Sequence, residues 1–313
     1  MKTKLIGMMI AFTLLIGSPG LAAAEKLSLM LDWFPNVDHL PVYVAREKGY
    51  FSDLDIDLDI ISPSETSDAL KLAASGNVDL AVSYQPQTII AADKGLLIKV
   101  VAPLVKHPLT TLLFLEGKGI ENPGDLSHKK IGYTVPGLMD VLLKAFADIN
   151  HIKDYTPVNV GFTILPALVS NKVDAVMGPF KTYETVTIAQ HGYTAKFFEL
   201  EKWGIPDYEE LIFVCGEQTL TQKASAVKKF VMAVEKAFAY TTDHPEDALA
   251  TYLSAVPQAD KKIETQAFEL TRPYFALNLA HDTAKWQAFA DFALKYNLIE
   301  NKIDAAQLIH NWK

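Results

Sequence analysis

The sequence SDALKLAASGNVDLAVSYQP, residues 67–86, has a partial copy later in the chain, ILPALVSNKVDAVMGPFKTYE, residues 164–184. Each copy starts with a helical pattern, passes a Gly or Asn that can end a helix, and continues into a short apolar strand. A polar or aromatic loop follows the strand in both copies. Helix–strand units that recur along a chain are typical of α/β domains with a mainly parallel sheet. The repeat therefore predicts two related α/β units.

The segments around the first copy continue the same alternation. Residues 26–33 predict a strand, and residues 39–48 predict a helix that Gly49 ends. Residues 54–62 alternate apolar and acidic side chains, which is the pattern of a half-buried strand. After residue 110 a new series of strands and helices begins, and the chain ends in long helical stretches. We therefore expect an α/β fold with more than one sheet.

Two short runs, Leu104–Thr110 and Glu199–Glu210, separate the two series and predict two crossings between lobes. Lobe 1 would comprise residues 25–106 and 208–313, and lobe 2 residues 107–207. Ligands of open α/β sheets bind beyond the carboxyl ends of the strands, and domain interfaces are favoured pocket sites. The sequence therefore predicts a ligand cleft between two α/β lobes.

Composition narrows the classes of function. The chain has 313 residues, half of them hydrophobic, and a formal net charge of -8. An acidic chain without a basic stripe argues against nucleic acid and against an anionic membrane surface as partners. The single cysteine, Cys215, stands in the apolar run LIFVC. This excludes an intrachain disulfide and a cysteine metal cluster, and it predicts a buried core residue.

Residues 1–24 have the layout of a cleavable signal peptide. MKTK is positive, LIGMMIAFTLLIG is apolar but short for a membrane span, and Ala22 and Ala24 are small residues suited to a cleavage site. No Cys follows the apolar stretch, so no lipid anchor is expected there. We expect a soluble periplasmic protein that starts near Glu25; an uncleaved anchor helix is the alternative.

Familiar catalytic and cofactor motifs are missing from the sequence. It contains no GxGxxG after the first strand, no GxxxxGK[ST], no HExxH and no GxSxG. Its histidines, such as His39, His107, His128 and His151, do not have the spacing of metal ligands. We therefore expect no cofactor, no metal site and no catalytic residue.

The stretch DWFPNVDH, residues 32–39, is nevertheless rich in groups that could hold a ligand. Trp33 could plug the core, or it could offer a flat face to a planar ring. Asn36 and Asp38 could build an Asx turn and an N-cap for the helix at Pro41, with or without a ligand contact. His39 could be hydrogen-bonded in the cleft wall, or it could act as a general base.

Loops that follow strands supply the other candidates. Tyr84 and Gln87 follow the strand of the first repeat copy, and the loop from Gly178 to Glu184 follows that of the second. Each could simply start a helix, or it could face the cleft. The run GYTVPG, residues 132–137, opens a helix after a strand, and its backbone N–H groups could bind an oxygen-bearing ligand group. This adds Tyr133, Thr134 and Gly137.

The run LDWFPNVDHLPVYVAREKGYF, residues 31–51, resembles the signature of the thiamin-pyrimidine (ThiY-like) family of periplasmic binding proteins. SGNVDLAVSYQP and NKVDAVMGPFKTYE are similar to two strand-and-loop modules of that family, and the resemblance covers nearly all of the chain after residue 25. The matching positions in the signature are Trp33, Pro35, Asn36, His39, Pro41, Tyr43, Ala45 and residues 47–51.

The resemblance implies a type II periplasmic-binding-protein fold. It also implies a solute-binding protein that delivers a thiamin-precursor pyrimidine, of the formylaminopyrimidine or hydroxymethylpyrimidine type, to the permease of an ABC importer. Trp33 and Tyr84 would flank the pyrimidine ring. Asn36 and Glu184 would bond its nitrogen and amine edge, and the GYTVPG loop would meet the side arm. A monomer that is not an enzyme is expected.

Two other readings share the fold. Fungal pyrimidine-precursor synthases have a histidine at the His39 position that serves as a reactant, but they are cytoplasmic and carry a cysteine-rich run that this sequence lacks. Binders of sulfonate, nitrate or small amines usually lack the Trp-x-Pro-Asn-x-x-His run. Both readings remain alternatives at the level of sequence.

Overall fold

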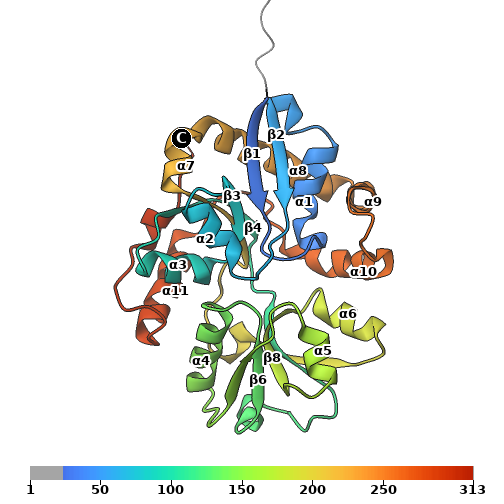
Figure 1. Ribbon diagram of the computed structural model, residues 1–313, viewed down its shortest axis with the longest axis vertical. Helices are drawn as coiled ribbons and strands as arrows, with labels where there is room; N and C mark the ends of the chain where they lie inside the picture. Colours follow the sequence, from blue (N-terminus) through green and yellow to red (C-terminus); the bar gives the residue numbers. More distant parts are fainter. Residues whose placement is uncertain (1–23, 313) are drawn as a thin grey trace, which may run out of the picture.

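The chain folds into two lobes, one above the other, in a computed structural model that describes residues 24–312 (Figure 1). Apart from Ala24, the predicted signal peptide lies outside the described residues. The upper sheet consists of β1 (Glu25–Met30), β2 (Ile56–Ile61), β3 (Leu80–Ser83), β4 (Ile98–Val105) and β10 (Leu211–Gly216). The lower sheet consists of β5 (Thr110–Leu115), β6 (Lys130–Tyr133), β7 (Thr156–Asn159), β8 (Ala175–Phe180) and β9 (Ala195–Glu199).

The two sheets have the same strand arrangement. The orders are β2-β1-β3-β10-β4 and β7-β6-β8-β5-β9. In each sheet the first three strands are parallel, and the fourth runs antiparallel to the central one. The central strands, β3 and β8, belong to the two copies of the sequence repeat. The loops after these strands therefore occupy equivalent places in the two lobes.

Helices lie on both sides of each sheet (Figure 1). In the lower lobe, α4 (Met139–Ile149) lies on one side and α5 (Ile164–Val169) and α6 (Glu184–Gln190) on the other. The upper lobe carries α1 (Leu40–Glu47), α2 (Asp68–Ala74), α3 (Gln85–Asp93), α7 (Glu217–Gln222), α8 (Ala224–Asp243), α9 (Pro245–Ala255), α10 (Lys261–Thr271) and α11 (Thr283–Lys295). The C-terminal helical stretches thus complete the lobe that the N-terminal strands begin.

The limits of two elements of the lower lobe do not follow from local sequence patterns. The residues from Gly178 to Phe180, expected in a loop, continue β8, and helix α6 begins at Glu184. Strand β7 spans Thr156–Asn159 and pairs in parallel with β6. Strand pairing decides both limits, and pairing partners are distant in sequence.

The chain passes between the sheets twice, after β4 and before β10. The carboxylate of Glu210 joins the two passages: Oε2 accepts the N–H groups of Leu109 and Thr110 at 2.6 and 2.7 Å, and Oε1 accepts the Thr110 hydroxyl at 2.8 Å. Glu210 is fully buried, and burial raises its pKa to about 7. A lobe division at residues 106–107 and 207–208 remains a prediction, and this carboxylate is the contact that would hold the passages together.

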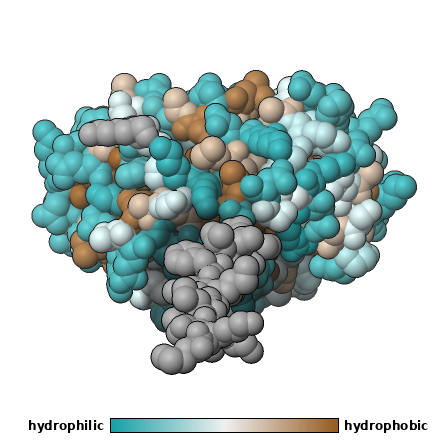
Figure 2. All heavy atoms as spheres, turned by 90° about the horizontal axis from the view of Figure 1, so that it is seen from above, coloured by the Kyte–Doolittle hydropathy of each residue, from teal (hydrophilic) through white to brown (hydrophobic). Residues whose placement is uncertain are grey.

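The single cysteine lies in the interior, and the face of the molecule seen from above carries mainly hydrophilic residues (Figure 2). Cys215 is completely buried in β10, as predicted, and burial raises the pKa of its thiol to about 12. Seen from above, the surface is mostly hydrophilic, with small hydrophobic areas between (Figure 2). Over the range 24–312, no helix combines the length and the apolar character that a membrane crossing needs.

Candidate functional site

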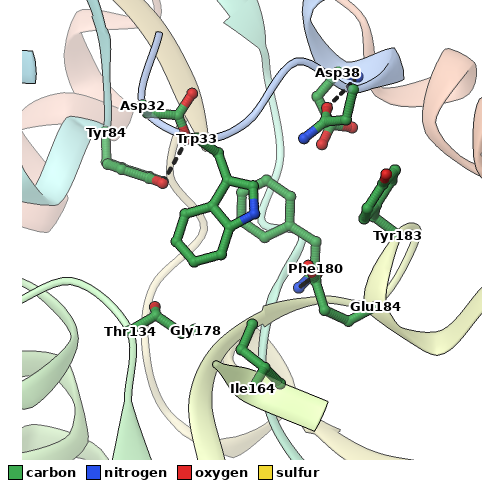
Figure 3. Close-up of a pocket in the computed structure, with 11 residues that line it drawn as sticks. Asp32, Trp33, Asp38, Tyr84, Thr134, Ile164, Gly178, Phe180, Tyr183 and Glu184 are labelled. Atoms are coloured by element: carbon green, nitrogen blue, oxygen red, sulfur yellow. Dashed lines mark hydrogen bonds between the residues drawn. The ribbon is translucent and has the colours of Figure 1, made fainter. Parts of the chain in front are cut away.

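A cavity lies where the two lobes meet (Figure 3). Both lobes contribute to its wall, through the loops that follow β1, β3, β6 and β8. Its lining residues are Asp32, Trp33, Asn36, Asp38, Tyr84, Thr134, Ile164, Gly178, Phe180, Tyr183 and Glu184. The cavity therefore collects side chains that are up to about 150 residues apart in the sequence.

Trp33 supplies the largest flat surface in the cavity. Its indole projects into the space between the lobes, with Tyr84 on one side and Phe180 and Glu184 on the other (Figure 3). Its ring centroid lies 4.6 Å from that of Phe162, which belongs to the lower lobe. Trp33 is only partly buried, and it lines the cavity.

The loop after β1 is built by Asn36. Its Oδ1 accepts the N–H of Asp38 at 2.8 Å and caps the short 3₁₀ turn Val37–His39. Asp38 was expected as a helix cap, and this expectation was wrong: helix α1 has no side-chain cap, and the carboxyl group of Asp38 lines the cavity. Because Asn36 already caps the turn, Asp38 is released for the cavity.

His39 stands behind the wall of the cavity. Its Nε2 lies 2.9 Å from Asp32 Oδ1, and the N–H of Asn36 donates to its Nδ1 at 3.4 Å. This pattern assigns the proton to Nε2, which donates to Asp32. Tyr84 donates its hydroxyl to the other oxygen of Asp32 at 2.6 Å. Asp32 therefore orients both Tyr84 and His39.

Glycine is required where the lower lobe closes the cavity. Gly178 has φ +122°, and a Cβ there would come within 2.0 Å of Thr134 Oγ1. Two strand ends can approach each other this closely only without a side chain at residue 178. Thr134 in turn accepts the Thr66 hydroxyl at its carbonyl oxygen, at 2.8 Å, which links the two lobes.

Two adjacent residues of the lower lobe, Tyr183 and Glu184, contribute polar groups to the cavity. Glu184 begins α6, and its Oε2 accepts the N–H of Phe180 at 2.6 Å. Tyr183 donates its hydroxyl to Glu264 of α10 at 2.8 Å, and Glu264 also accepts the N–H of Val37 at 2.9 Å. Glu264 thus joins the lower lobe to the loop that carries Asn36 and Asp38.

Six of the ten predicted site residues line the cavity: Trp33, Asn36, Tyr84, Thr134, Gly178 and Glu184. The other four lie beside it. Gln87 accepts the hydroxyl of Ser83, and the N–H of Gly137 donates to Asp140 at 2.7 Å, so that N–H does not face the cavity. Tyr133 packs against the core, and His39 contacts Asp32. Direct ligand binding by the ten residues remains a prediction.

Sequence reasoning missed five lining residues: Asp32, Asp38, Ile164, Phe180 and Tyr183. Asp32 and Asp38 stand in the stretch that was singled out, and Tyr183 precedes Glu184. The repeat offered a signal for Phe180 and Tyr183, since it placed the whole loop 178–184 at a strand end. Nothing local distinguished Asp38 from an ordinary cap.

Burial makes the carboxyl groups of the cavity weak acids. The pKa of Asp38 is raised to about 8, mainly by desolvation; His39 and the Thr271 hydroxyl oppose the rise, and the nearby Glu184 and Asp32 contribute to it. Desolvation likewise raises the pKa of Glu184 to about 7, with Asp32 adding to the effect and the Phe180 N–H opposing it. Glu264 also has a pKa of about 7 because it is buried. Near neutral pH these carboxyl groups therefore retain protons.

These shifts predict how stability changes with pH. Asp38, Glu184, Glu210 and Glu264 bind protons more tightly when folded than when unfolded, where such groups titrate near pH 4. The free energy of unfolding should therefore fall as the pH rises from about 5 to about 8. Melting temperatures measured across this range should fall with it, and a shallower slope is expected for Glu264→Gln. A melting temperature that rises with pH would contradict the prediction.

No group of three or more His, Cys, Asp or Glu side chains in the described part of the chain is arranged to hold a metal ion. The chemistry available in the cavity is therefore that of one large aromatic face, several carboxyl groups and an amide. Such a set suits a planar molecule whose edge carries hydrogen-bond donors.

The chain is similar to proteins of thiamin metabolism. Residues 36–248 match the profile of the family described as NMT1/THI5 like. A thiamine biosynthesis protein of Haemophilus influenzae is 35% identical over 283 residues, 88% of this chain and 89% of that protein. The formylaminopyrimidine-binding protein of Halalkalibacterium halodurans is 32% identical, over 76% of this chain and 73% of its own length.

Similarity also extends to enzymes and to sulfonate binders. The 4-amino-5-hydroxymethyl-2-methylpyrimidine phosphate synthase THI11 of Saccharomyces cerevisiae is 26% identical, over 88% of this chain and 85% of its own. The crystal structure of the periplasmic aliphatic sulphonate binding protein SsuA from Escherichia coli superposes with a TM-score of 0.68 at 14% identity, over 92% of this chain and 93% of that one. The expected two-lobed periplasmic-binding-protein fold is thereby confirmed.

Proposed function

Because the chain belongs to the NMT1/THI5-like family, we propose that it is a solute-binding protein that holds a thiamin-precursor aminopyrimidine between its lobes. The ligand is of the formylaminopyrimidine or hydroxymethylpyrimidine type. The protein acts as a monomer in the periplasm and delivers the ligand to the permease of an ABC importer. The name of the Halalkalibacterium halodurans relative supports this class of ligand.

The observation that carries the proposal is the pairing of one aromatic face with a polar edge inside the cavity. Trp33 stacks on the ring, and Tyr84 closes the other side. The amide nitrogen of Asn36 donates to a ring nitrogen, since its oxygen is engaged with the Asp38 N–H. The carboxylate of Glu184 accepts the exocyclic amine. Stacking of this kind contributes about 1–3 kcal/mol per ring.

The same cavity favours binding over the synthase reaction. The synthase of Saccharomyces cerevisiae is named for a phosphate ester. In the described range, the cavity lining contains three carboxyl groups and no Lys or Arg that could hold a phosphate. His39, the expected reactant of a synthase, is buried against Asp32. We therefore propose a protein that is not an enzyme.

The experiment is a calorimetric titration of the mature chain, residues 25–313, with formylaminopyrimidine and hydroxymethylpyrimidine. Nitrate, taurine and small amines serve as comparison ligands. Tight binding of a pyrimidine without turnover is expected. A pyrimidine product, or a mass change at His39, would support the synthase instead. A response to taurine or nitrate alone would support a binder of another solute.

Glu184→Gln should weaken aminopyrimidine binding about ten- to a hundredfold. A hydrogen bond to a charged group contributes about 1.5–3 kcal/mol. The amide in Glu184→Gln would have only one acceptor oxygen, and the Phe180 N–H would compete with the ligand for it. The dissociation constant is measured by calorimetry at pH 8. Thr185→Ala, on the same helix but outside the cavity lining, should bind as the wild type does. Equal affinity for the Gln variant and the wild type would remove Glu184 from the site.

A further inference from the structure

One carboxyl oxygen in the cavity has no partner. Asp38 is 1% exposed, and its Oδ1 accepts the hydroxyl of Thr271 at 3.1 Å. Its Oδ2 is buried and makes no hydrogen bond. Because Asp38 lines the cavity, a bound molecule can satisfy this atom; the Tyr252 hydroxyl, which interacts with Asp38 and is also buried without a partner, is the competing donor. A buried carboxyl oxygen left without a partner is destabilising.

A second carboxyl group faces Asp38 from the other lobe. Glu184 begins α6 of the lower lobe, whereas Asp38 belongs to the upper lobe, and the two interact electrostatically. Asp32 provides a third carboxyl group, and the cavity lining within residues 24–312 includes no cationic side chain. The groups that face Asp38 from the surrounding elements are His39, Asp32, Glu184, Thr271, Tyr183 and Tyr252.

We propose that Asp38 is the specificity-determining residue of the cavity. Together with Glu184, it admits heterocyclic amines that bring a positive charge or share a proton, and it rejects their anionic derivatives. The inference rests on the proposed function, because it concerns the same cavity and the same class of ligand. Trp33 selects ligands by their planar shape, and Asp38 with Glu184 selects them by their charge.

The chemistry follows from the proton that the two carboxyl groups retain. A ring nitrogen next to an amino group accepts the proton of a carboxylic acid while the amine donates to a carboxylate. The pair Asp38 and Glu184 offers both forms at once, because their pKa values of about 8 and about 7 leave one of them protonated near neutrality. The complex keeps this proton between Asp38 and the ring. A phosphate group would instead meet like charges, which weakens its binding.

The wild-type protein is tested with two probes, 4-amino-5-hydroxymethyl-2-methylpyrimidine and its phosphate ester, at pH values from 6 to 9.5. The uncharged pyrimidine should bind more weakly as the pH rises above about 8, by up to about tenfold per pH unit for one proton. The phosphate ester should bind roughly a hundredfold more weakly than the alcohol at pH 7. Calorimetry in two buffers of different ionisation enthalpy should show proton uptake near pH 8.5.

Asp38→Asn separates this role from a merely structural one. In this variant the affinity for the alcohol should depend less on pH. The ratio of the affinities for alcohol and ester should fall by about tenfold or more. A structural role would weaken both ligands equally and leave the pH profile unchanged. Asp59→Asn, an exposed change of the same charge on β2, is the control and should behave as the wild type. Circular dichroism establishes that each variant is folded.

The outcomes distinguish the inference from the proposed function. The proposed selection by charge is wrong if the affinity for the alcohol is constant from pH 6 to 9.5, or if the phosphate ester binds as tightly as the alcohol. Either result would leave the proposed binding function intact. If neither pyrimidine nor formylaminopyrimidine binds at any pH, the proposed function is wrong and the inference falls with it. The wild-type measurements decide both points without any variant.

Discussion

Replacement of Trp33 by alanine is expected to weaken aminopyrimidine binding about ten- to a hundredfold. Trp33 offers the cavity its largest aromatic face, and its indole lies between the two lobes (Figure 3). Loss of one stacked ring contact costs about 1–3 kcal/mol, which corresponds to this range of affinity.

The measurement is a calorimetric titration with formylaminopyrimidine, accompanied by a thermal melt. Trp33→Phe keeps an aromatic face and should recover most of the affinity. Trp203→Ala, which changes an exposed tryptophan outside the cavity lining, should not alter binding. Because Trp33 is only partly buried, the melting temperature should change little. An affinity that survives Trp33→Ala would show that the ring binds elsewhere.

The second large effect concerns stability. Glu210→Ala should lower the free energy of unfolding by about 3 kcal/mol or more. The change leaves the N–H groups of Leu109 and Thr110 and the hydroxyl of Thr110 without their acceptor. Each buried donor without a partner costs about 1–3 kcal/mol. Burial of the Glu210 carboxyl group is itself unfavourable, as its raised pKa of about 7 shows. Removing this group therefore offsets part of the loss in the free energy of unfolding.

A melt monitored by circular dichroism should show a fall of about 5–10 °C for Glu210→Ala, given the size of the chain. Glu210→Gln keeps one acceptor oxygen and should lie between the wild type and the alanine variant. Glu235→Ala removes an exposed carboxylate from α8 and should change the melting temperature by no more than about 1 °C. A melting temperature of Glu210→Ala that equals the wild-type value would show that other contacts hold the two passages.

Much of the site could be predicted because its residues stand at strand ends that local patterns mark. Tyr84 and Glu184 follow the strands of the two repeat copies, Gly178 lies near the end of the second of these strands, and Trp33 follows β1. The parallel strands of a sheet bring their carboxyl ends to one edge, so local position predicted proximity. Gln87 and Gly137 are also close to strand ends, but their own neighbours, Ser83 and Asp140, engage them.

The roles of Asp38 and His39 could not be predicted in the same way. Asp38 has the spacing of a helix cap, but Asn36 takes that role first. His39 has the chemistry of a base, but its Nε2 is engaged by Asp32. In both cases a neighbour within seven residues decides the role: Asn36 takes the cap in place of Asp38, and Asp32 is the hydrogen-bond partner of His39. Sequence alone does not show these pairings, because they depend on the path of the loop.

The sequence by itself determined the alternation of strands and helices, the repeat that predicts two related α/β units, and the aromatic and acidic chemistry of DWFPNVDH. These are properties of periodicity and residue type, which are local. Tertiary structure alone decided that Asp38 faces Glu184, that Tyr183 reaches Glu264, and that the carboxyl groups retain protons. Burial and contact between lobes depend on residues up to about 150 positions apart, and a carboxyl group becomes a weak acid only where that packing removes it from water.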